Sequence, residues 1–156
     1  MALVGAVLLI FVVSCSRQPD EHAFAQIAVG YVLDNAALPG KKIVVLDSEN
    51  LEALPTEIRA ELASRLDAAD VEWIALDIEG DVDQLPGQWQ ETSSIGRLSR
   101  VNQTHILLRV QVNRQGRARD LQWSLRCGPL CGRGGEAVFH WSGEEWSREK
   151  ESTVSY

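Results

Sequence analysis

The chain has 156 residues, of which 45% are hydrophobic and 24% are charged. This composition is typical of one ordinary globular domain and excludes a disordered or fibrous protein. The formal net charge of −7 argues against nucleic acid as a partner, because phosphate binding requires a basic surface.

The chain begins with a short apolar segment. Residues 2–13 are all apolar or glycine, and Ser14 and Cys15 follow directly. Twelve residues are too few to span a bilayer as a helix, which takes about 20. They suit the apolar region of a secretory signal, which has about 7–15 residues. The alternative is a cytosolic protein with an apolar N-terminus, which would expose an aggregation-prone run.

The tetrapeptide Val12-Val13-Ser14-Cys15 resembles the lipobox of bacterial lipoproteins. The resemblance implies that Cys15 receives a diacylglycerol and becomes the first residue after cleavage. We therefore expect a signal peptide at 1–14, a lipidated tether at 15–22 and a single domain at 23–156. The expected location is the cell envelope, with the domain facing the periplasm on a membrane anchor. Ser16, by the sorting rule of these lipoproteins, favours the outer membrane.

Residue patterns in the first half of the domain predict helices that alternate with short strands. Apolar residues at helical spacing predict a helix from Asp20, as its cap, to about Leu38, and a second from Thr56 to Ala68, with Thr56 as its cap. Residues 41–46 and 71–78 are rich in strand formers. Glycines and a proline predict a loop between 79 and 94.

From residue 95 the pattern changes to the period of two that is typical of strands. Strands are predicted at 105–112, 118–127 and 136–142, and a last one begins at Trp146. Apolar side chains alternate with polar ones, so one face of this meander should be polar. The predicted fold class is α+β, with two N-terminal helices packed on a mainly antiparallel sheet and a C-terminal β-meander.

A glycine-rich motif contains the other two cysteines. Cys127-Gly-Pro-Leu-Cys131-Gly-Arg-Gly, followed by Gly143-Glu-Glu-Trp146, resembles a motif of small bacterial envelope lipoproteins. The match covers under a fifth of the chain and implies architecture, because that family carries no established catalytic residues. An even cysteine pair in an exported protein favours a Cys127–Cys131 disulfide. There are two alternatives: a redox dithiol, or a metal site that also uses His105 or His140.

Charge is strongly segregated along the chain. Residues 16–96 hold sixteen acids against five bases, whereas residues 97–133 hold eight arginines and one acid. A possible anion-binding set on the polar face and its adjoining turn comprises Arg109, Arg126, Arg133, His105 and His140. The arginines have two possible kinds of partner: the acidic N-terminal half of the same chain, or an external anionic lipid or acidic envelope protein.

No residue pattern specifies a reaction, a metal or a cofactor. The sequence therefore predicts a non-enzymatic binding or structural module of the envelope, anchored to the membrane through Cys15. The alternative is a metal- or histidine-dependent envelope enzyme that uses the outward face of the C-terminal sheet.

Overall fold

The computed structural model describes residues 17–38, 43–76, 105–128 and 131–155. For His105, Cys127 and Cys131 it describes the backbone but not the side chain. The elements in chain order are α1 (Glu21–Ala36), β1 (Ile43–Asp47), α2 (Ser48–Ala53), α3 (Thr56–Ala68), β2 (Trp73–Leu76), β3 (His105–Gln115), β4 (Ala118–Gly128), β5 (Cys131–Trp141) and β6 (Trp146–Ser155). The loop expected at 79–94 lies outside the described residues.

The two predicted helices form, and a third lies between them. Asp20 caps α1 as predicted, because its Oδ1 accepts a hydrogen bond from the Ala23 N–H at 3.0 Å. The helix ends at Ala36, where Ala37 adopts a left-handed conformation. Helix α3 has the predicted bounds, but its cap is Pro55 and Thr56 is its first residue. Helix α2 has six residues, too few for a helical period to be visible in the sequence.

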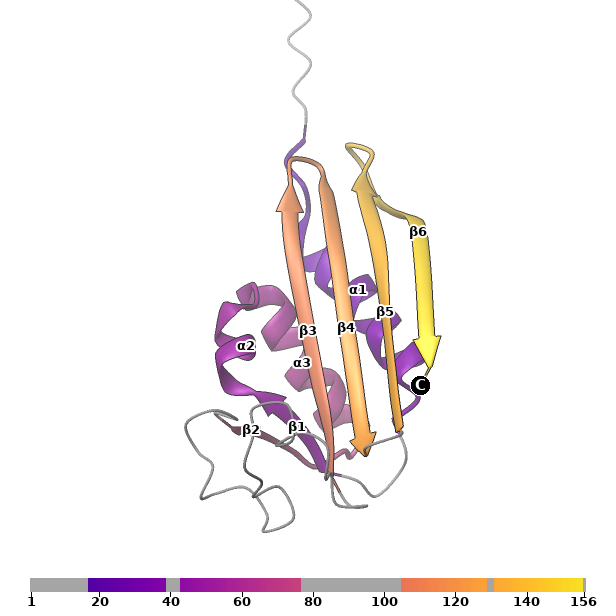
Figure 1. Ribbon diagram of the computed structural model, residues 1–156. Coiled ribbons are helices and arrows are strands. Elements are labelled where there is room, and N and C mark those ends of the chain that lie inside the picture. Colours follow the sequence, from indigo (N-terminus) through magenta and orange to yellow (C-terminus); the bar gives the residue numbers. More distant parts are fainter. Residues whose placement is uncertain (1–16, 39–42, 77–104, 129–130, 156) are drawn as a thin grey trace, which may run out of the picture.

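The six strands form one sheet in the order β2-β1-β3-β4-β5-β6 (Figure 1). Strand β1 pairs in parallel with both β2 and β3, and the pairs from β3 to β6 are antiparallel. The α+β class, the N-terminal helices and the C-terminal meander are therefore confirmed. The β3–β4 and β5–β6 turns lie at one end of the sheet, and the β4–β5 turn lies at the other.

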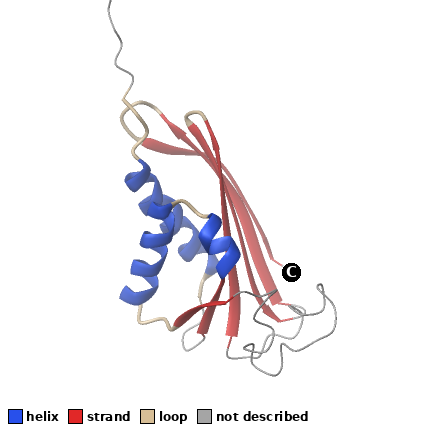
Figure 2. Ribbon diagram, turned by 90° about the vertical axis from the view of Figure 1, so that its left-hand side faces the viewer, coloured by secondary structure: helices blue, strands red, loops and turns tan. Residues whose placement is uncertain are grey.

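The helices lie against one face of the sheet (Figure 2). The hydrophobic core between the two layers includes Phe24 and Val32 from α1, Leu62 from α3, and Leu121 and Phe139 from the sheet. The opposite face of β3 and β4 carries Arg109, Gln111, Gln122 and Ser124, and no described helix covers it. We call these four residues the polar face. Alternation along β3 and β4 follows the predicted period of two.

Strand β5 begins five residues earlier than predicted. The glycine-rich residues 131–135 lie outside the predicted strand, but they pair with β4. Among the described glycines, only Gly116 and Gly143 have positive φ. Gly135 serves another purpose, because a Cβ there would lie 2.8 Å from Trp123 Nε1 and 2.7 Å from the Ser152 carbonyl oxygen. The glycine gives the buried indole of Trp123 room to lie flat on β5.

Candidate functional site

Three arginines of the basic segment pair with acids from the N-terminal half. Arg109 Nη2 lies 2.5 Å from Asp47 Oδ2, and Arg119 Nη2 lies 2.5 Å from Glu21 Oε1. Arg114 lies 3.7 Å from Glu21 and 3.9 Å from Glu57, and both distances exceed that of a strong hydrogen bond. Of the two kinds of partner considered for the arginines, these three residues have the internal one, an acid in the N-terminal half of the same chain.

The Arg119 pair is built into the core. Arg119 is only 5% exposed, although it is a charged residue. Its Nη1 donates to the carbonyl oxygens of Gly116 and Ala118, and its guanidinium lies 5.2 Å from the ring centroid of Trp146. Carboxylate, carbonyl and aromatic partners together compensate for the loss of water around the charge. This arginine is structural and is not free to bind a ligand.

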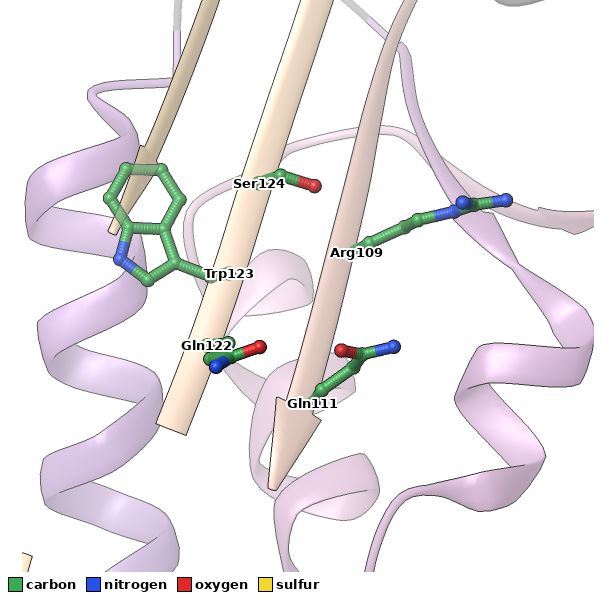
Figure 3. Close-up of a pocket in the computed structure, with 5 residues that line it drawn as sticks. All are labelled: Arg109, Gln111, Gln122, Trp123 and Ser124. Carbon is green, nitrogen blue, oxygen red and sulfur yellow. The ribbon is translucent and has the colours of Figure 1, made fainter. Parts of the chain in front are cut away.

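The Arg109 pair lies on the polar face, beside two adjoining hollows. The first hollow, of about 250 Å³, is lined by Arg109, Gln111, Gln122, Trp123 and Ser124. Figure 3 shows Arg109 and Gln111 projecting from β3 and Gln122 and Ser124 from β4, while the Trp123 ring lies on the other side of β4. The second hollow, of about 320 Å³, is lined by Asp47, Glu49, Asn50, Ala53, Arg109 and Gln111. Arg109 thus borders both.

Asp47 is the buried partner of this pair, at 7% exposure. Its position follows from the topology, because β1 ends at Asp47 while β3 continues past it. Beyond the end of β1, the side chain of Asn50 in α2 is the next hydrogen-bond partner of β3. Its Oδ1 accepts a hydrogen bond from the Val110 N–H at 3.1 Å. Arg109 Nε is buried, and among the described residues it has no hydrogen-bond partner. A ligand in these hollows therefore meets the Arg109 guanidinium, side-chain amides, a hydroxyl and, in the second hollow, the carboxylates of Asp47 and Glu49.

The structure brings only part of the expected anion-binding set together. Arg126 is opposite Leu107 and Arg109 is opposite Ser124, so the two arginines are diagonal neighbours on one face. Arg133 is opposite Leu125, which places it on the helix side of the sheet. His140 is exposed on the polar side, but it pairs with Ala118, eight residues along β4 from Arg126. That separation is about 26 Å.

The two histidines are too far apart to share one site. His105 begins β3, whereas His140 is opposite Ala118, which in turn pairs with Gln115 at the end of β3. Ten residues of strand separate them, about 33 Å. Within the described ranges, no group of three His, Cys, Asp or Glu residues could hold a metal ion.

The cysteine pair lies at the β4–β5 turn. Gly128 pairs with Cys131 and Arg126 pairs with Gly132, so Cys127 is an extra residue in a bulge of β4. The backbones of the two cysteines are therefore close neighbours across the turn. Cys15, the expected lipidation site, lies outside the described residues, as does the whole apolar segment at 2–13.

Side chains of β4, β5 and β6 hold the segment that follows Cys15. Trp141 Nε1 donates to the Arg17 carbonyl oxygen at 3.1 Å, and Trp146 Nε1 donates to the Asp20 carbonyl oxygen at 2.7 Å. Arg119 binds the Glu21 carboxylate one residue further on. We call Trp141, Trp146 and Arg119 the tether clamp. The expected boundary between tether and domain, at residues 22 and 23, falls inside α1.

No residue pattern in the sequence predicts this clamp. The two indole rings contact each other, with centroids 5.4 Å apart. Their partners, however, are backbone carbonyl groups 124 and 126 residues away along the chain. Every residue has a backbone carbonyl group, so the sequence does not show which carbonyl groups bind the two indoles.

None of the helices in the described ranges is long and apolar enough to cross a membrane. Comparison of the chain with known protein families, with curated proteins and with solved structures gave no match.

Proposed function

We propose that this chain is a lipid-anchored protein of the bacterial envelope, acylated at Cys15, and that its domain is a non-enzymatic binding or structural module. The main support is the lipobox-like tetrapeptide Val12–Cys15. The position of the following segment agrees with such an anchor. Residues 17–20 lie along one end of the domain, so the chain leaves the fold there and not through its middle (Figure 1).

The polar face is the proposed binding surface. Its two hollows share Arg109 and Gln111, and amide, hydroxyl and guanidinium groups converge there. Because Asp47 already neutralises Arg109, the hollows favour an uncharged hydrogen-bonding group of a partner over a free anion. Arg109 Nε has no hydrogen-bond partner among the described residues, so a carbonyl oxygen of a partner would supply its acceptor. Arg126 is exposed on the same face and is available to an acidic group beside that acceptor.

The turn between β4 and β5 is proposed to be closed by a Cys127–Cys131 disulfide. A disulfide spans Cα atoms about 4.4–6.8 Å apart, and neighbours across an antiparallel turn fall in this range. The bridge would fix the shape of the turn at the end of the sheet opposite the tether clamp.

We propose the outer membrane as the location of the protein, because Ser16 follows the lipidated Cys15.

Acylation is tested by replacing Cys15 with Ser in the full chain expressed in a bacterium. We expect the wild type in the membrane fraction with a diacylglycerol-modified N-terminal cysteine by mass spectrometry, and the variant in the soluble fraction. Ser14→Ala is the matched control, because it keeps a small residue before the cysteine and should remain acylated. A wild-type protein without an acyl group would refute the anchor.

A further inference from the structure

The tether clamp limits how far the domain can stand from its anchor. Arg17 is the second residue after Cys15, and a fully extended chain spans about 3.5 Å per residue. The Arg17 carbonyl, held by Trp141, is therefore within about 7 Å of the residue that carries the lipid. If the clamp opened as far as Glu21, the sixth residue after Cys15, the reach would grow to about 21 Å.

The clamp is built from several contacts that support one another. Asp20 uses its carbonyl oxygen for Trp146 and its carboxylate for the cap of α1. Trp146 packs against Phe24 of α1, with ring centroids 5.0 Å apart, and beneath the guanidinium of Arg119. Releasing the segment therefore breaks a helix cap, an ion pair and an aromatic cluster together.

The clamped segment lies at the end of the sheet that carries two turns. The β3–β4 turn contains Arg117, and the β5–β6 turn contains Glu144 and Glu145; all three are exposed. Ser155, at the other end, is aligned with Arg133 and Leu125, seven residues along β4 from Ala118. The two ends are thus about 23 Å apart along the strands.

We infer that the tether clamp fixes the orientation of the domain on a lipid bilayer, so that the β3–β4 and β5–β6 turns face the headgroups and the β4–β5 turn points away. This inference rests on the proposed acylation of Cys15. The end of the sheet with the β3–β4 and β5–β6 turns contacts the bilayer surface. The polar face then stands roughly perpendicular to the bilayer, where other proteins can reach it.

The test uses the acylated full chain in vesicles of phosphatidylcholine, which carry no net charge and so cannot orient the arginines. A fluorescent unnatural amino acid replaces Arg117 in one sample and Ser155 in another, which leaves the native cysteines in place. Nitroxide-labelled headgroups quench the probe over short distances. We expect a loss of fluorescence at position 117 and no loss at position 155.

The clamp variant is Trp141→Phe combined with Trp146→Phe, which removes both indole donors and keeps aromatic rings in the cluster. We expect the difference in quenching between positions 117 and 155 to shrink or vanish. Trp73→Phe is the control, because it removes a comparable indole bond, to Asp67 Oδ1 at 2.8 Å, far from the clamp. This control should keep the full difference. Circular dichroism and cooperative unfolding check that each variant is folded.

The outcomes separate the inference from the proposed function. Mass spectrometry of the vesicle-bound protein reports acylation directly, and its absence would overturn both. An acylated protein with equal quenching at positions 117 and 155 would overturn the orientation alone. A difference that persists in the folded clamp variant would overturn the role of the two tryptophans.

Discussion

Each face of the sheet holds an arginine–carboxylate pair with one buried member, and the buried member differs between the two faces. On the helix side, the Arg119 side chain is 6% exposed and that of Glu21 is 25% exposed. On the polar face the carboxylate is the buried member: the Asp47 side chain is 9% exposed and the Arg109 side chain is 39% exposed. The Arg119 guanidinium is enclosed by its partners, whereas more than a third of the Arg109 side chain is open to solvent. The helix-side pair is therefore a fixed part of the fold, and the polar face leaves its arginine within reach of a partner.

The largest difference between the faces is expected at two adjacent residues of β4. Leu121 is 1% exposed and faces the helices, whereas Gln122 belongs to the polar face. Leu121→Ala should lower the free energy of unfolding by about 3–4 kcal/mol, because it opens a cavity in the core. Gln122→Ala, its matched control, should change it by less than about 0.5 kcal/mol. Urea unfolding measures both, and similar losses would mean that the two faces are not distinct.

The helix-side ion pair should give the next largest effect. Glu21→Gln keeps the size of the side chain but leaves the buried Arg119 without its carboxylate. We expect a loss of about 2–3 kcal/mol in the free energy of unfolding, moderated by the two carbonyl groups that still bind Arg119. Glu57→Gln is the control, because its contact with Arg114 is exposed and 3.9 Å long, and should cost under about 0.5 kcal/mol. Equal losses for both would show that burial does not set the strength of these pairs.

The packing of Trp123 on β5 gives a somewhat smaller effect. Gly135→Ala would place a Cβ 2.8 Å from Trp123 Nε1, so either the indole or strand β6 must shift. Such overpacking should cost about 2 kcal/mol. Gly30→Ala in α1 is the control, because its Cβ meets nothing within 4 Å, and it should stabilise the protein by about 0.5–1 kcal/mol. A neutral Gly135→Ala would indicate that the glycine is not needed for space.

Local patterns predicted much of this fold, and contacts between distant segments account for what they missed. The period of two in β3 and β4 identified the buried face, because each strand has one apolar and one polar side. Helix α3 was predicted by apolar residues at helical spacing, but its cap is Pro55 and not the predicted Thr56. Residues 131–135 were left out of the predicted strand, since the role of Gly135 depends on Trp123 of the neighbouring strand.

The candidate site was predicted less completely. The polar face and Arg109 followed from alternation, and an internal acidic partner was one of two stated alternatives. Which acid pairs with which arginine depends on the parallel pairing of β1 with β3, which brings Asp47 beside Arg109 across 62 residues of chain. Short apolar runs such as Ile43–Leu46 do not reveal their partner strand, so this pair could not be assigned from the sequence.

The smallest effect is expected at the polar-face pair. Arg109→Met keeps the length of the side chain but removes its charge, and it leaves Asp47 buried beside an apolar group. The penalty is limited because the Arg109 side chain is 39% exposed, so solvent already screens part of the wild-type pair. We expect a loss of about 1 kcal/mol in the free energy of unfolding at pH 7. Adding Asp47→Asn to Arg109→Met should recover part of it, because no charge then remains to be buried. A loss as large as that of Glu21→Gln would show that Arg109 is as much a structural residue as Arg119, and the polar face would then lose its best candidate for contact with a partner.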